Sequence, residues 1–108
     1  MGMNVQELPA KRVRELYKGD NLYLILTFMD GELYDIAPSI SGERINKDQG
    51  ALSNLDALCA MTSRCLREYD KEYIAGILLE CSRGPSTLPC ILANAILEHG
   101  NETNLRDV

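Results

Sequence analysis

The segment Leu22–Ala37, Leu-Tyr-Leu-Ile-Leu-Thr-Phe-Met-Asp-Gly-Glu-Leu-Tyr-Asp-Ile-Ala, determines the fold class. Its first half, Leu22–Met29, is the strongest strand candidate in the chain because it is rich in apolar and aromatic residues. Asp30-Gly31 follows, a pair preferred in two-residue hairpin turns because both positions need a positive φ. The segment therefore predicts a β-hairpin whose second strand, Glu32–Ala37, ends before Pro38.

The register of this hairpin follows from its turn. A two-residue turn pairs Met29 with Glu32, Phe28 with Leu33 and Ile25 with Ile36. Both faces are then largely apolar, so alternation alone does not choose the side that packs on the core. Helices on one face and a partner on the other would account for this pattern, which makes a homodimer one candidate arrangement.

A charged segment, Lys11–Tyr17, precedes the hairpin and is expected to be an edge strand, with Val13, Glu15 and Tyr17 on one side. Three helices are expected after the hairpin, because apolar residues recur there at helical spacing. The ranges expected for them are Gly50–Tyr69, Lys71–Glu80 and a third helix from about Pro89 to Gly100.

The start of each helix carries a capping signal. Ser53 opens a sequence that resembles a capping box, and Asp70 precedes the second helix. Ser86 or Thr87 is expected to cap the third.

Strands followed by helices predict an α+β fold in two layers, an antiparallel sheet of two to three strands with three helices packed on one face. We expect a single domain over residues 10–100, with a flexible arm at 1–9 and a polar tail at 101–108. The chain has 108 residues, which suits one domain.

Composition narrows the classes of function. The net charge is −5, which argues against nucleic-acid binding through a basic surface. Apolar runs fall short of the roughly 20 residues of a membrane span, and Met1–Pro9 does not resemble a signal peptide. A cytoplasmic protein without a membrane partner is expected.

The cysteines, at positions 59, 65, 81 and 90, form no Cys-x-x-Cys pair, and His99 is the one histidine. Cys81 and Cys90 lie on either side of a Gly-Pro turn, so they are candidates for a redox or metal-binding pair with iron or zinc. The simpler interpretation, which we favour, is two small buried residues and no cofactor. His99 is explained by the dipole at a helix C-terminus.

A second candidate site is the start of the third helix. Arg83, Ser86 and Thr87 surround a turn before the helix and are candidates to bind an anion or a partner, although helix capping is the simpler role for the hydroxyl groups. No Ser-His-Asp set, phosphate-binding loop or dinucleotide fingerprint is present, so we expect no catalytic residues and no enzyme activity of the isolated chain.

The order of elements, together with Cys81–Ile96, resembles the TSCPD domain, which occurs at the C-terminus of adenosylcobalamin-dependent ribonucleotide reductases and in small stand-alone proteins. The similarity covers Lys11 to His99. The family's motif, Thr-Ser-Cys-Pro-Asp before an alanine-containing helix, corresponds here to Ser86-Thr87-Leu88-Pro89-Cys90. Leu88 thus stands at the family's cysteine, and Cys90 at its aspartate.

The resemblance implies a non-catalytic binding or regulatory module that docks onto another protein, with a ribonucleotide reductase catalytic subunit as the candidate partner and Ser82–Cys90 as the recognition surface. The element order also resembles iron–sulfur scaffold proteins, which gives an alternative function, a metal or cluster scaffold that uses Cys81 and Cys90. A self-associating structural protein without a ligand is the third hypothesis.

Overall fold

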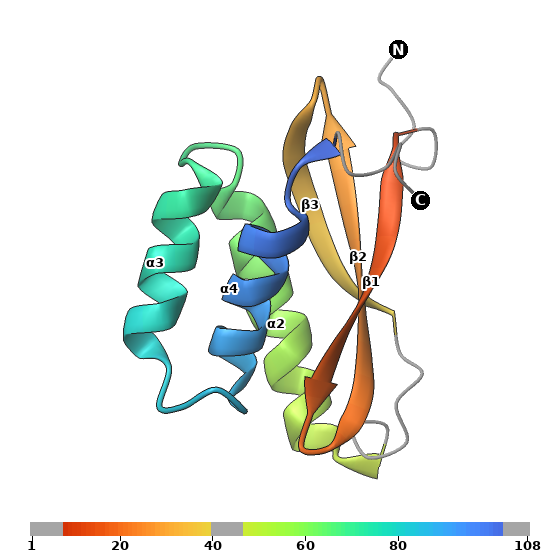
Figure 1. Ribbon diagram of the computed structural model, residues 1–108, viewed down its shortest axis with the longest axis vertical. Helices are drawn as coiled ribbons and strands as arrows, with labels where there is room; N and C mark the ends of the chain where they lie inside the picture. The colour runs from red at the N-terminus through yellow and green to blue at the C-terminus, as the bar shows by residue number, and fades with distance from the viewer. Residues whose placement is uncertain (1–7, 40–46, 103–108) are drawn as a thin grey trace.

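The computed structural model describes residues 8–39 and 47–102 and shows a twisted sheet with all of its described helices on one side (Figure 1). The sheet is antiparallel, in the order β1-β2-β3, with strands β1 (Ala10–Tyr17), β2 (Asp20–Met29) and β3 (Glu32–Ser39). The helices that follow are α2 (Gln49–Cys65), α3 (Lys71–Cys81) and α4 (Leu88–His99). The predicted α+β class is confirmed.

The helices lie at two depths. α2 packs along β3 and α4 packs along β1, so these two helices cover the sheet directly. α3 packs chiefly on α4 and lies farthest from the sheet (Figure 1). This leaves part of the apolar surface of α3 without a neighbour.

The core lies between the sheet and its two covering helices. Four side chains that alternate along β2 are buried there: Leu22, Leu24, Leu26 and Phe28. Full burial of such a side chain contributes about 1.5–3 kcal/mol. On the opposite face, the guanidinium of Arg12 lies 3.8 Å from the ring centre of Tyr23. The structure thereby identifies the core side, which alternation in the sequence left open.

The hairpin turn forms as predicted. Asp30 has φ 54° and Gly31 has φ 83°, the positive values that a two-residue turn of this kind requires. Met29 pairs with Glu32, which confirms the expected register next to the turn.

The expected pairing of Ile25 with Ile36 is wrong. The register shifts between Thr27 and Phe28, so Ile25 pairs with Ala37, and Ile36 pairs with Leu26. An extra residue in one strand reverses the side that every later residue faces. The shift places Ile36 in the core, where it is buried.

The boundaries of α2 also differ from those expected. The helix starts at Gln49, and its cap is Asp48, whose Oδ1 accepts a hydrogen bond of 3.0 Å from the backbone N–H of Ala51. Ser53 lies within the helix, so the predicted capping box there is wrong. At the other end α2 stops at Cys65, before the expected Tyr69.

Two expectations fall partly outside the described residues. These are the arm at 1–9 and the tail at 101–108, of which the structure describes only residues 8, 9, 101 and 102. Among the helices that the structure describes, none combines the length and apolarity needed to cross a bilayer.

Candidate functional site

The two cysteines singled out from the sequence lie in different settings. Cys81 is the last residue of α3 and is exposed. Cys90 is half-buried in the first turn of α4, where its Sγ accepts a hydrogen bond of 3.7 Å from Asn94 Nδ2. Both are free thiols. In residues 8–39 and 47–102, one group of three potential metal ligands comes together, and it contains neither cysteine.

The hydroxyl groups before α4 hold a turn. Thr87 occupies the N-cap position, but its side chain makes no cap hydrogen bond, so its predicted capping role is wrong. Instead its hydroxyl donates to the carbonyl oxygen of Gly84 at 2.8 Å and lies 2.8 Å from the hydroxyl of Ser82. Arg83 and Ser86 are exposed beside this turn. Because the Thr87 hydroxyl already has these partners, it is a poor candidate for an anion ligand.

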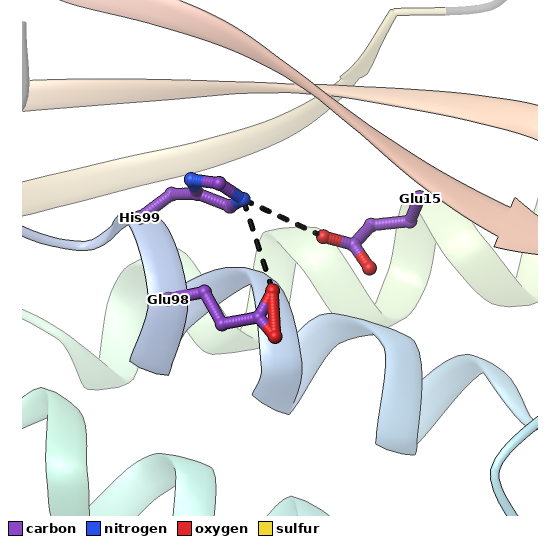
Figure 2. A group of neighbouring side chains, drawn as sticks. All are labelled: Glu15, Glu98 and His99. Atoms are coloured by element: carbon purple, nitrogen blue, oxygen red, sulfur yellow. Dashed lines mark ion pairs between the residues drawn. The ribbon is translucent and has the colours of Figure 1, made fainter.

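The group of three ligands that the structure brings together was not predicted. It consists of Glu15 from β1 and of Glu98 and His99 from the end of α4 (Figure 2). Oε2 of Glu15 and Oε1 of Glu98 each lie 3.9 Å from Nε2 of His99. One ligand atom from each residue lies within 4.8 Å of the other two.

This group, the Glu15–Glu98–His99 cluster, carries surplus negative charge. The Glu15 side chain is only 14% exposed, whereas that of Glu98 is 64% exposed. Burial, and then the nearby Glu98 carboxylate, raise the pKa of Glu15. The cluster also lies at the C-terminal end of α4, where the helix dipole is negative. The site therefore favours a cation.

One sequence signal pointed to this cluster. Strand alternation placed Glu15 on the same side as Val13 and Tyr17, and both of these prove to be buried. A carboxylate on a buried strand face needs a partner, because an isolated buried charge is costly. His99 supplies that partner from the far end of the chain, which no local pattern could have indicated.

A second candidate site is an apolar groove between α2 and α3. Its volume is about 320 Å³, and it is lined by Leu58, Met61, Thr62, Cys65, Tyr69, Tyr73, Ile74, Ile77 and Leu78. Tyr73 and Ile77 share the helical spacing of the buried residues Ile74 and Leu78, but they are 58% and 42% exposed. The reason is that α3 buries Ile74, Ala75 and Leu78 instead.

Comparison of the chain with protein-family models, with curated proteins and with solved structures found no match.

Proposed function

We propose that the chain is a non-catalytic binding module that docks onto a partner protein through the apolar groove between α2 and α3. The observation that carries the proposal is the exposure of four large side chains along this groove, Met61, Tyr69, Tyr73 and Ile77. Scattered apolar residues are normal on a protein surface, but a contiguous set in a groove is typical of an interaction site.

The occupant that fits the groove is an amphipathic helix with a basic flank. Two neighbouring helices present a furrow into which the apolar side of a third helix can pack. The aromatic rings of Tyr69 and Tyr73, with centres 5.5 Å apart, supply broad contact surfaces at one end. The net charge of −5 repels a second copy of the chain and attracts a basic partner.

The resemblance to the TSCPD domain supplies one partner to test, the catalytic subunit of a ribonucleotide reductase. In this proposal the groove, rather than the Ser82–Cys90 segment, makes the main contact. The module acts in the cytoplasm, which agrees with cysteines that are all free thiols.

A matched pair of variants tests the groove. Ile77 and Leu79 lie on the same helix and are both 42% exposed, but only Ile77 lines the groove. The probe is a fluorescent leucine–lysine peptide with the apolar spacing of an amphipathic helix, and the control peptide has the same composition in scrambled order. We expect Ile77→Asp to weaken binding of the amphipathic peptide at least tenfold and Leu79→Asp to leave it nearly unchanged, as measured by fluorescence anisotropy.

Two results would contradict this proposal. Equal binding of the two peptides would show that only charge attracts them. A dimer that dissociates in Ile77→Asp but not in Leu79→Asp, measured by light scattering across a range of concentrations, would show that a second copy occupies the groove. The latter result would favour the self-associating structural protein.

A further inference from the structure

We propose that Glu15, Glu98 and His99 form a binding site for a divalent first-row transition-metal ion, with Zn²⁺ as the best fit. The site lies between β1 and the end of α4 and shares no residue with the groove between α2 and α3. The proposal therefore stands independently of the docking function.

The spacing of the ligand atoms fits such an ion. Zn²⁺ binds histidine nitrogen and carboxylate oxygen at about 2.0–2.2 Å, so tetrahedral coordination separates neighbouring ligand atoms by about 3.4 Å. Nε2 of His99 lies 3.9 Å from an oxygen of each glutamate. Figure 2 shows both carboxylates approaching the same ring nitrogen from different elements. Both separations exceed the tetrahedral spacing by about 0.5 Å, so Glu15 and Glu98 would each move slightly toward His99 when the ion binds.

The same distances show that the ion pairs within the cluster are long. A separation of 3.9 Å between His99 Nε2 and either carboxylate exceeds hydrogen-bonding distance. Glu15 is largely buried, and a second carboxylate and the negative end of α4 lie beside it. A divalent cation at the centre would offset this negative charge and would be coordinated by the imidazole nitrogen of His99.

The donor set selects the class of metal. Mg²⁺ and Ca²⁺ prefer oxygen donors throughout, whereas a mixture of imidazole and carboxylate suits zinc and its transition-metal neighbours. Three protein ligands leave a fourth position for water or another group, as in open zinc sites. A bound ion would link the edge strand β1 to α4 and so raise the temperature at which the protein unfolds.

Titration of tag-free, metal-free protein with Co²⁺ and with Zn²⁺ tests the site. We expect one ion per chain by calorimetry, weak visible absorption from bound Co²⁺, and no absorption band from cobalt–thiolate bonds. Glu98→Gln and His99→Gln should each weaken metal binding about tenfold or more. Even the replacement of a residue that only hydrogen-bonds to a metal ligand lowers the affinity by about that factor. Glu80→Gln, an exposed change on α3, is the control and should bind like the wild type.

Two outcomes would overturn the site. Binding that shows cobalt–thiolate absorption, survives His99→Gln and is lost in Cys81→Ser would place the ion on the cysteines. If neither Co²⁺ nor Zn²⁺ bound the folded protein, the cluster would be a group of ion pairs only. Circular dichroism measures whether the variants fold. We expect them to keep the wild-type fold because the side chains of Glu98 and His99 are 64% and 37% exposed.

Discussion

Two polar side chains enter the interface between helices and sheet, one at each edge, and they are held in different ways. At the β3 edge, Ser63 of α2 accepts a hydrogen bond of 3.0 Å from the backbone N–H of Ile36, and its hydroxyl lies 3.0 Å from the Ile36 carbonyl oxygen. At the β1 edge, Glu15 lies 3.9 Å from His99, beyond hydrogen-bonding distance. The first contact is complete because it consists of short hydrogen bonds, whereas the second is a long ion pair and is called incomplete for that reason.

The complete contact protects an edge strand. The backbone groups at the outer edge of a sheet can pair with strands of other molecules. Ser63 accepts from the N–H of Ile36, and its single hydroxyl hydrogen is shared between the carbonyl oxygens of Ile36 at 3.0 Å and Cys59 at 2.8 Å. A single hydroxyl therefore fixes α2 against β3 and blocks one position of that edge.

Replacing the serine should produce the largest change in stability. In Ser63→Ala the N–H and carbonyl of Ile36 lose their side-chain partner in a buried place, which costs about 1–3 kcal/mol of unfolding free energy. Urea denaturation followed by circular dichroism measures the loss. Ser53→Ala, on the exposed side of the same helix, is the control and should cost nothing. Equal effects of the two changes would mean that the buried hydrogen bonds contribute little.

The sequence predicted the β2–β3 turn because the cause is local. Asp30 and Gly31 accept the positive φ values of the turn, and those two residues carry the whole signal. The Ser63 contact could not be predicted in the same way. It depends on which residue of β3 directs its backbone N–H and C=O toward the outer edge of the sheet. The irregularity near Phe28 shifts the β2–β3 register by one residue. Nothing in the alternation of β3 marks the extra residue.

The candidate sites show the same difference between features with a local cause and features that depend on distant segments. Periodicity identified the apolar residues of α3, but it did not show that Tyr73 and Ile77 would stay exposed, because that depends on how α3 docks on α4. Glu15 and His99 meet only because β1 and α4 become neighbours in the folded chain. Contacts between distant segments set both sites, and the sequence pattern is informative only within one segment.

A matched pair of helix starts sharpens the comparison between complete and incomplete polar contacts. Asp48 and Asp70 are both N-cap residues, yet only the Asp48 side chain accepts a cap hydrogen bond. Asp48→Ala should therefore lower the unfolding free energy by about 1 kcal/mol, and Asp70→Ala by clearly less. Urea denaturation of both variants measures the difference. A larger loss in Asp70→Ala would mean that its carboxylate caps α3 in solution.

Removing the charge of Glu15 at the incomplete contact should produce the smallest change in the free energy of unfolding. The change should be a gain in stability instead of a loss. Burial and Glu98 raise the pKa of Glu15, so the folded protein holds this proton more tightly than the unfolded chain does. The unfolding free energy then falls as the pH rises from the ordinary range of a glutamate through the raised pKa, and the deficit persists above it. Glu15→Gln removes that dependence and should be slightly more stable than the wild type at pH 7 in a chelator.

The gain from Glu15→Gln should disappear on acidification below the ordinary pKa range of a glutamate, where the wild-type carboxyl is protonated in both states. Added Zn²⁺ should reverse the order at pH 7, because only the wild type keeps all three ligands. Urea midpoints under these three conditions measure both effects. If the wild type were more stable than Glu15→Gln at pH 7 in a chelator, the pairing of Glu15 with His99 would outweigh the cost of burying the carboxylate. The contact would then be complete without a metal.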